Sequence, residues 1–302
     1  MKRTQPAAGG PAEPGLDPAL VRDLVSRALA EDVGTGDITT AATVDPTLRA
    51  TGLFIARQDC VLCGLPLARA VFASLDPAIR WTDMAAEVRA GATGEGTELA
   101  AGDCFATVAG SCAALLTGER TALNFLQRLS GIATLTRHAV REVEGTRALV
   151  LDTRKTTPTM RAIEKYAVRT GGAANHRFGL FDAVLIKDNH VALAGGISAA
   201  ILRARAAGRA IADIEVEVDD IEGALEAIEA GATHLLLDNF TPQQVAEAVR
   251  GIGGRARVEV SGGLRPGELR AYAEAGADCL SIGRLTHSAP AVDISLEVEP
   301  LA

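Results

Sequence analysis

Short apolar runs alternate with helical patterns through the second half of this sequence. The runs predicted to form strands occupy residues 148–153, 181–188, 213–218, 233–239, 257–263 and 278–284. Helical patterns lie between them, at residues 161–170, 196–207, 220–231, 241–252 and 265–276. In the last three, apolar residues recur every three or four positions, and Asp220 and Thr241-Pro242 are typical helix starts. Strands separated by helices predict a parallel sheet of right-handed βαβ units.

The repetition favours a barrel over a doubly wound sheet. Residues 229–238, EAGATHLLLD, and 274–283, EAGADCLSIG, are two copies of a helix end, a turn and a strand. The sequence contains no Gly-x-Gly-x-x-Gly dinucleotide-binding fingerprint. Six strands are predicted where a complete barrel has eight. The barrel is therefore either incomplete or contains strands that the pattern does not reveal.

Polar or glycine-rich residues stand at the carboxyl end of each predicted strand. In chain order they are Asp152, Arg154 and Lys155; Lys187 and Asp188; Glu217; Asp238 and Asn239; Ser261, Gly262 and Gly263; and Ser281, Gly283 and Arg284. A parallel barrel brings all these ends to one face, where barrel enzymes keep their active sites. We therefore expect the functional site on this face.

Two kinds of strand end suggest phosphate and metal binding. The turns Ser261-Gly262-Gly263 and Ser281-Ile282-Gly283 follow the last two strands, where backbone N–H groups often bind phosphate. His287 follows the second turn and is positioned to donate to the same phosphate. Glu217 and Asp238 suit Mg²⁺ shared with substrate phosphates and water. The alternative for these two carboxylates is ion pairing with nearby Arg or Lys.

A cationic set points to an anionic ligand. Its members are Arg154, Lys155, His176, Arg177 and Lys187. Arginine binds carboxylates through two parallel hydrogen bonds, and lysine supplies a compact point charge. The set predicts a ligand with several negative charges. His176 by itself is more typical of a hydrogen-bonded structural histidine, but its neighbour Arg177 and the flanking glycine-rich loop favour a place in the site.

Composition limits the other classes of function. The net charge of −8 argues against a nucleic-acid or anionic-membrane binder, because both need a basic face. No apolar run approaches the roughly 20 residues that span a bilayer. The five cysteines are an odd number, and the C-x-x-C pair Cys60 and Cys63 lacks a second pair to complete a zinc site. We therefore expect a cytoplasmic protein with reduced thiols.

The first part of the chain has a different organisation. Residues 1–15 are predicted to be a disordered tail. A helix is expected at 17–32, strand at 50–64, a second helix at 65–75 and a long helix at 116–143. Arg120 then falls in the first turn of the long helix, where its positive charge opposes the helix dipole.

Several long motifs together resemble the quinolinate phosphoribosyltransferases, also called carboxylating nicotinate-nucleotide pyrophosphorylases. The motifs are DTRKTTPTMR, GGAANHRFGLFDAVLIKDNH, LLLDNF, VEVSGGL and LSIGRLTHSAPAVDISLEV, with EDVGTGDITT and GERTALNFLQRLSGIAT upstream. The resemblance runs from about residue 17 to residue 298. It implies an α/β fold with an N-terminal α/β sandwich domain at 16–130, to which 285–302 returns, and an open, TIM-like α/β barrel at 131–284.

The resemblance also implies a reaction. Quinolinate and phosphoribosyl pyrophosphate would give nicotinate mononucleotide, pyrophosphate and CO₂, with Mg²⁺ as cofactor, in a homodimer with shared active sites. By motif, the cationic set would line the quinolinate and pyrophosphate pocket, with Lys155, Lys187, Glu217 and Asp238 as the catalytic group. Arg120 would reach the site of the neighbouring subunit. The two carboxylates would bind the ribose hydroxyls and the metal, and the two glycine-rich turns with His287 would hold the 5′-phosphate.

Two alternatives belong to other classes of protein. Lys187 at a strand end is also typical of a class I aldolase-type lyase, in which the lysine forms a Schiff base. A non-catalytic relative that only binds an anion is the second alternative. The complete cationic set and both carboxylates favour the phosphoribosyltransferase.

Overall fold

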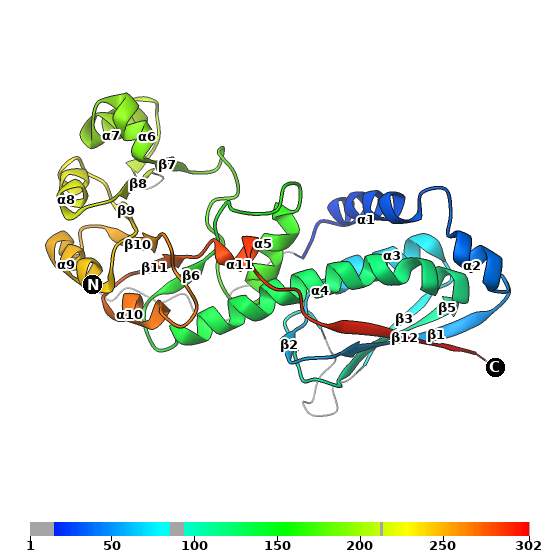
Figure 1. Ribbon diagram of the computed structural model, residues 1–302. Coiled ribbons are helices and arrows are strands. Elements are labelled where there is room, and N and C mark those ends of the chain that lie inside the picture. The colour runs from blue at the N-terminus through cyan, green and yellow to red at the C-terminus, as the bar shows by residue number, and fades with distance from the viewer. Residues whose placement is uncertain (1–14, 85–93, 212–213, 302) are drawn as a thin grey trace. The chain divides into compact units, whose positions relative to one another are not determined.

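The computed structural model of the chain describes residues 15–84, 94–211 and 214–301 (Figure 1). Residues 1–14, which make up nearly all of the predicted tail, lie outside this range. The chain divides into two compact units. The first contains the described residues up to Arg128 and those from Val292 onward, and the second runs from Leu129 to Ala291.

The first unit is built on a four-stranded antiparallel sheet. Its order is β12-β1-β5-β3, formed by β1 (Arg49–Ala56), β3 (Arg80–Asp83), β5 (Cys104–Ser111) and β12 (Ile294–Pro300). The short strands β2 (Cys60–Val61) and β4 (Glu98–Leu99) pair separately. Its helices are α1 (Pro18–Val33), α2 (Ile38–Thr43), α3 (Leu65–Leu75) and the first part of α4 (Cys112–Glu142). The final strand β12 completes one edge of the sheet by pairing with β1.

An aromatic cluster fills the core of this unit. Burial alternates along β1, so that Phe54 points into the core. Its ring centroid lies 5.1 Å from that of Trp81, 5.8 Å from Phe105 and 6.0 Å from Phe72 on α3. Period-two burial of this kind is what one solvated and one covered face of an antiparallel sheet require.

Helix α4 begins earlier than the sequence pattern predicted. It starts at Cys112 rather than at residue 116 and extends for 31 residues. Arg120 therefore lies about two turns inside the helix, not in its first turn, and it is exposed. The prediction that the charge of Arg120 opposes the helix dipole was wrong, because the dipole acts mainly within the terminal turn of a helix.

The second unit contains a six-stranded parallel sheet in the order β6-β11-β10-β9-β8-β7. The strands are β6 (Leu149–Leu151), β7 (Val184–Ile186), β8 (Ile214–Val218), β9 (His234–Asp238), β10 (Arg257–Ser261) and β11 (Cys279–Ser281). In the described part of the chain the edge strands β6 and β7 do not pair with each other. The predicted α/β fold with an incomplete, open barrel is confirmed.

Helices cover the outer face of this sheet. The helices of the unit are α5 (Arg161–Thr170), α6 (Asp188–Ala194), α7 (Ile197–Ala206), α8 (Ile221–Glu229), α9 (Pro242–Ile252), α10 (Leu269–Glu274) and α11 (Arg284–His287), of which α7, α8 and α10 contact the strands and α5 contacts α11. Figure 1 shows α7 to α10 stacked along the outer side of the strands. The predicted starts of α8 and α9 are confirmed, because Asp220 accepts from Gly223 N at 2.7 Å and Thr241 from Gln244 N at 3.3 Å.

The two faces of the strands differ in chemistry. On β8, Ile214, Val216 and Val218 are buried, while the glutamates between them are partly exposed. Because side chains alternate between faces, these apolar residues face the helices and the glutamates face the concave side. A polar concave face is thus encoded in the strand sequence IEVEV.

Gly131 in the second unit tests the tightness of packing around α4. A Cβ on Gly131 would lie 2.0 Å from the carbonyl oxygen of Pro290, which is backbone and cannot rotate away. We expect Gly131→Ala to lower the free energy of unfolding by about 1–3 kcal/mol, as overpacking does. Chemical denaturation measures it.

Gly251 on α9 provides the matched control. Its Cβ would meet only Leu225 Cδ2 at 3.6 Å, an ordinary contact. Gly251→Ala should therefore raise stability by a few tenths to about 1 kcal/mol. Equal effects from the two substitutions would contradict this account of the packing.

Candidate functional site

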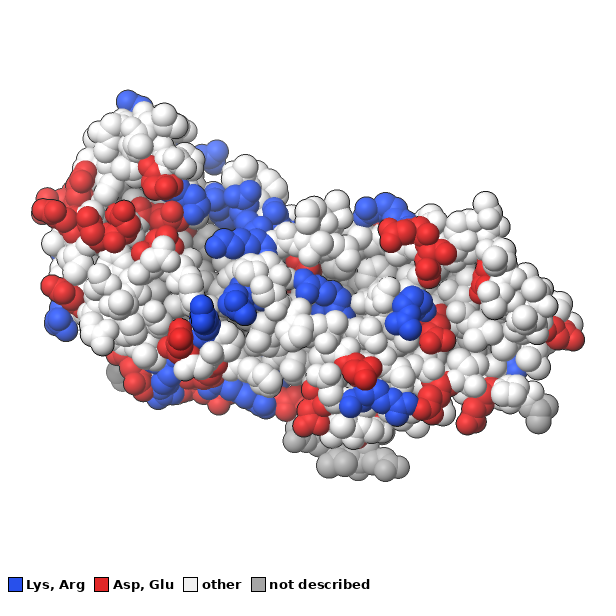
Figure 2. Space-filling view, viewed as in Figure 1, with Lys and Arg blue, Asp and Glu red and all other residues white. Residues whose placement is uncertain are grey.

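The predicted site residues of the second unit come from the carboxyl ends of its strands. Register pairs Asp238 with Ser261 across β9 and β10, and Ser281 with Leu151 across β11 and β6. Lys187 directly follows β7, and Glu217 lies one residue before the end of β8. The parallel sheet therefore brings these ends to one edge. Figure 2 shows Lys and Arg side chains gathered near α5, α11 and the segment before β7, with Asp and Glu beside them over α8, β8 and β9.

Lys187 forms an ion pair with Glu217. The lysine Nζ donates to Glu217 Oε2 in a short contact, and the glutamate side chain is only 13% exposed against 43% for the lysine. Asp238 on the neighbouring strand accepts from Asn239 Nδ2 at 2.7 Å. Both carboxylates thus stand at adjacent strand ends, with one of them already neutralised by a lysine.

Two arginines of the cationic set influence each other. Burial, followed by the nearby charge of Arg154, lowers the pKa of Arg177. Arg177 Nη1 donates to the carbonyl oxygen of Ala183 at 3.1 Å. Arg154 Nε is buried and has no hydrogen-bond partner among the described residues. A buried, unsatisfied N–H next to a second guanidinium is costly by itself and suits an anion that completes the hydrogen bonds.

The two glycine-rich turns approach their neighbours closely. A Cβ on Gly262, where φ is +89°, would lie 2.3 Å from Asn239 Oδ1. A Cβ on Gly283 would meet Lys155 Cδ at 2.9 Å and His287 Cδ2 at 3.2 Å. Glycine at both positions therefore leaves room for these side chains. Lys155, His287 and the backbone at Gly283 come together at one corner of the site.

A buried ion pair organises the segment that carries His176. Asp152, directly after β6, and Lys165, on α5, are fully buried and their Oδ1 and Nζ atoms lie 2.5 Å apart. Burial raises the pKa of Asp152 and lowers that of Lys165, and their mutual attraction counters both shifts. Asp152 also accepts from His176 N at 2.8 Å and Asn175 Nδ2 at 2.6 Å, and Lys165 donates to His176 O at 2.9 Å.

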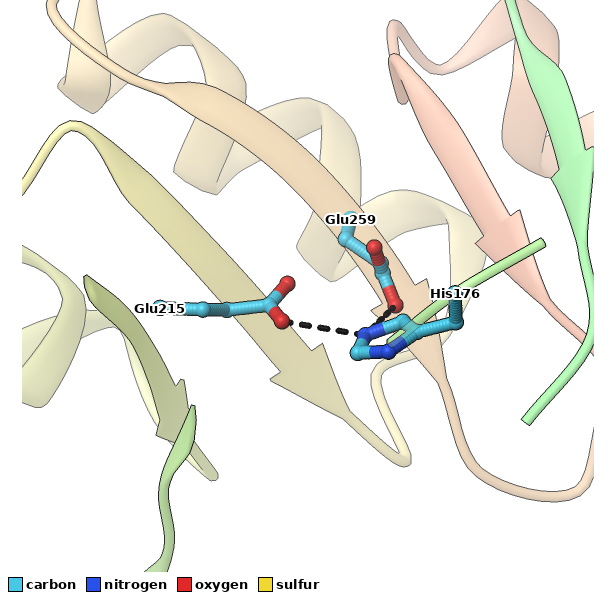
Figure 3. Close-up of side chains that lie close together, drawn as sticks. All are labelled: His176, Glu215 and Glu259. Carbon is cyan, nitrogen blue, oxygen red and sulfur yellow. Dashed lines mark hydrogen bonds and ion pairs between the residues drawn. The ribbon is translucent and has the colours of Figure 1, made fainter. Parts of the chain in front are cut away.

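The side chain of His176 points into the concave side of the sheet, between two glutamates (Figure 3). Its Nε2 lies 3.0 Å from Glu215 Oε2 and 3.3 Å from Glu259 Oε1. Glu259 also accepts a short hydrogen bond from the Ser281 hydroxyl. His176, Glu215 and Glu259, with Arg177, line a cavity of about 250 Å³.

Two influences act in opposite directions on the protonation of His176. Burial alone would lower its pKa, but the hydrogen bonds and charges of Glu215 and Glu259 raise it to about 9. The second proton would have to occupy Nδ1, because Nε2 faces the carboxylates. Arg177 N donates to Nδ1 at 2.7 Å, and this hydrogen bond favours the neutral ring. The proton on Nδ1 and the Arg177 contact are therefore mutually exclusive. Because the Arg177 contact is present, the observed geometry corresponds to the neutral ring with its proton on Nε2, and a second proton can enter only when that contact breaks.

The same geometry argues against a metal at His176. The side chains of His176, Glu215 and Glu259 offer ligand atoms that all lie within 4.8 Å of one another. A metal on Nε2 would need the ring proton to move to Nδ1, where the Arg177 N–H already points. Glu217 and Asp238 present only carboxylate oxygens and involve no ring proton, so they are the better candidates for a divalent cation. A cation that binds Glu217 Oε2 would have to displace Lys187 from it.

Sequence reasoning did not assign Glu215, Glu259 or Lys165 a place around the site. The signal for the two glutamates was present in the alternation of IEVEV and RVEVS, which puts them on the face opposite the apolar residues. Lys165 carried no comparable signal, because its burial depends on the distant partner Asp152.

Two of the cysteines are buried thiols with a raised pKa. Burial raises the pKa of Cys60 and of Cys279 to about 11. Thiols of that pKa are poor nucleophiles at neutral pH.

None of the helices in the described residues is long and apolar enough to cross a membrane.

Family models and known proteins match almost the whole chain. Residues 37–130 match the N-terminal domain of quinolinate phosphoribosyl transferase, and residues 132–297 match its C-terminal domain. A nicotinate-nucleotide pyrophosphorylase [carboxylating] of Mycobacterium leprae is 43% identical over 92% of this chain and 96% of its own length. A probable nicotinate-nucleotide pyrophosphorylase [carboxylating] of Bacillus subtilis is 38% identical over 92% and 93%. The crystal structure of NadC from Streptococcus pyogenes has a TM-score of 0.89 at 39% identity, covering 96% of this chain and all of that one.

Removal of the buried cation tests the role of the Asp152–Lys165 pair. Lys165→Met leaves the carboxylate of Asp152 buried without its main partner. We expect the free energy of unfolding to fall by about 3–5 kcal/mol, measured by chemical denaturation. Arg27→Met, which breaks the exposed Arg27–Asp23 pair on α1, should cost less than about 1 kcal/mol. A loss at Lys165 as small as that at Arg27 would contradict this role.

Proposed function

The chain belongs to the quinolinate phosphoribosyltransferase family, and from this membership we infer that it catalyses the carboxylating nicotinate-nucleotide pyrophosphorylase reaction. Quinolinate and phosphoribosyl pyrophosphate react to give nicotinate mononucleotide, pyrophosphate and CO₂ in NAD biosynthesis. The reaction takes place at the carboxyl ends of the parallel strands of the second unit.

Two neighbouring arginines are the main support for the position of the quinolinate site. Arg154 keeps a buried, unpartnered Nε beside the guanidinium of Arg177. Quinolinate has two carboxylates, and two neighbouring guanidinium groups are suited to such a ligand. We propose that Arg154 and Arg177 bind quinolinate, with His176 forming part of the pocket wall and Lys155 and Lys187 adding positive charge for pyrophosphate.

The remaining predicted residues have roles toward the ribose and its phosphates. Glu217 and Asp238 would hold the ribose hydroxyls and Mg²⁺, since carboxylates at adjacent strand ends supply the oxygen ligands that this ion prefers. When bound, Mg²⁺ neutralises charge on the departing pyrophosphate. The 5′-phosphate would be held by Ser261, Gly262, Gly263, Ser281, Gly283 and His287.

The mechanism that fits these residues is electrostatic. Lys155, Lys187 and the arginines stabilise negative charge as pyrophosphate leaves the ribose, and the pyridine nitrogen then attacks the oxocarbenium-like carbon. Once the ring nitrogen is quaternary, the adjacent carboxylate departs as CO₂ because the ring stabilises the carbanion that remains. A proton from water then adds to that carbon and gives nicotinate mononucleotide. No side chain needs to form a covalent bond with the substrate.

The geometry favours this reaction over a Schiff-base lyase. A Schiff-base lysine attacks as a neutral amine in a weakly charged pocket, whereas Lys187 is ion-paired with Glu217. Borohydride should therefore trap no carbonyl substrate on Lys187.

Substitutions of the ion pair test the assignment. We expect Lys187→Ala and Glu217→Ala each to lower kcat/KM by at least about 100-fold, because each removes a charge that acts in the transition state. The measurement is release of pyrophosphate and CO₂ from the two substrates with Mg²⁺. Arg250→Ala, which removes a charge from the exposed side of α9, is the control and should be unchanged. Near wild-type turnover in either site variant would show the assignment to be wrong.

We further propose that the enzyme is a cytoplasmic homodimer in which Arg120 completes the quinolinate pocket of the neighbouring subunit. Arg120→Ala and Glu217→Ala proteins should then each be inactive alone. Mixing and reassociating them should restore about a quarter of the sites, because half of the randomly formed dimers are mixed and each mixed dimer has one intact site. Absence of recovery despite subunit exchange, measured by mass spectrometry of the dimers, would count against the shared site.

A further inference from the structure

We propose that Glu259, aided by Ser281 and Glu215, positions Arg177 for substrate through the imidazole of His176. This inference rests on the proposed function, because Arg177 is taken to bind the quinolinate carboxylate. Glu259 and Glu215 do not contact substrate in this account; they act on a residue that does. The Ser281 hydroxyl donates to Glu259, and only the backbone of Ser281 is assigned to the 5′-phosphate.

Glu259 is itself held firmly in place. Its side chain is only 9% exposed, on the concave face of β10. The Ser281 hydroxyl donates to the same carboxylate oxygen, Oε1, that lies 3.3 Å from His176 Nε2. Glu259 is therefore fixed by a neighbouring strand before it meets the histidine, as a positioning group needs to be.

The two glutamates fix the orientation of the His176 ring. His176 Nε2 lies between Glu259 and Glu215, whose side chain is 16% exposed. An N–H directed at two carboxylate oxygens fixes both the plane of the ring and the nitrogen that carries its proton. The opposite nitrogen, Nδ1, is left as an acceptor.

The His176 ring is connected to Arg177 by a hydrogen bond. The Arg177 backbone N–H donates to Nδ1 at 2.7 Å. The His176 backbone is held on both sides by the buried pair, because its N–H donates to Asp152 and its carbonyl accepts from Lys165. The peptide between His176 and Arg177 is thus fixed, and the guanidinium of Arg177 starts from a defined backbone position.

The competing explanation is that the carboxylates only fill the concave face and have no effect on substrate. The two explanations differ in what a small change at Glu259 does. If Glu259 acts through the ring, Glu259→Gln removes the negative charge from the hydrogen bond to Nε2, even when the amide oxygen takes the place of Oε1. The orientation of the ring is then held less firmly, and the Nδ1 contact is disturbed. If Glu259 is only a filler, the nearly isosteric amide leaves substrate binding unchanged.

The test combines kinetics with nitrogen NMR of His176 in the full-length enzyme. We expect Glu259→Gln and Ser281→Ala to raise KM for quinolinate roughly tenfold or more, with kcat changed less, as loss of a charge-assisted hydrogen bond predicts. The ¹⁵N spectrum of the ligand-free wild-type protein should show Nδ1 unprotonated at neutral pH, and Glu259→Gln should alter that signal. Glu259→Asp should recover part of the wild-type KM.

The control is Glu247→Gln. Glu247 is exposed on α9 and is not among the residues that line the cavity. This variant makes the same change from carboxylate to amide and should keep KM and the His176 signal, which separates a specific effect of Glu259 from the loss of a carboxylate elsewhere in the unit.

The outcomes distinguish this inference from the proposed function. An active wild-type enzyme whose Glu259→Gln variant keeps its KM overturns the positioning role and leaves the function intact. A protonated Nδ1 in the wild-type protein at neutral pH also overturns it. A wild-type protein without activity overturns the function, and the ¹⁵N signal then still decides whether Glu259 controls the His176 ring.

Discussion

The buried ion pair of Asp152 and Lys165 is the constraint on which the rest of the site depends. Removing two charges from water costs several kcal/mol per ion, and the cost is offset only when geometry and additional hydrogen bonds satisfy both groups. Here the additional partners are Asn175 and the backbone of His176. The ion pair is therefore satisfied only when this segment adopts one conformation, and that conformation directs His176 toward the glutamates.

The site also shows how an acidic protein binds an anionic substrate. The net charge of −8 gives no general attraction for negative ligands. The attraction is local, because arginines and lysines from several strand ends meet at one edge of the sheet. Carboxylates hold some of these groups in place, because Glu217 pairs with Lys187 and Glu259 contacts His176. The attraction for an anionic substrate therefore comes from where the cationic side chains lie and not from the net charge of the protein.

Sequence predicted the architecture well because the βαβ repeat leaves a regular trace in apolar spacing. It succeeded less where structure depends on distant contacts. The predicted strand at 181–188 is observed only as Val184–Ile186, because the preceding segment carries the Arg177 and Asp182 contacts instead of pairing. Burial of Lys165 could not be anticipated for the same reason. The position of Arg120 was misjudged because helix α4 continues upstream through small residues that carry little periodicity.

The open edge of the sheet has a consequence of its own. Eight strands would close the barrel, and further strands would then occupy the opening between the edge strands β6 and β7. With six strands, the segment after Ala174, which forms one bridge to Leu151, is free to turn inward. His176 reaches Glu215 and Glu259 through this seam. The opening between the edge strands therefore admits His176 to the concave side of the sheet. Strands paired in that opening would exclude the histidine from the interior of the fold.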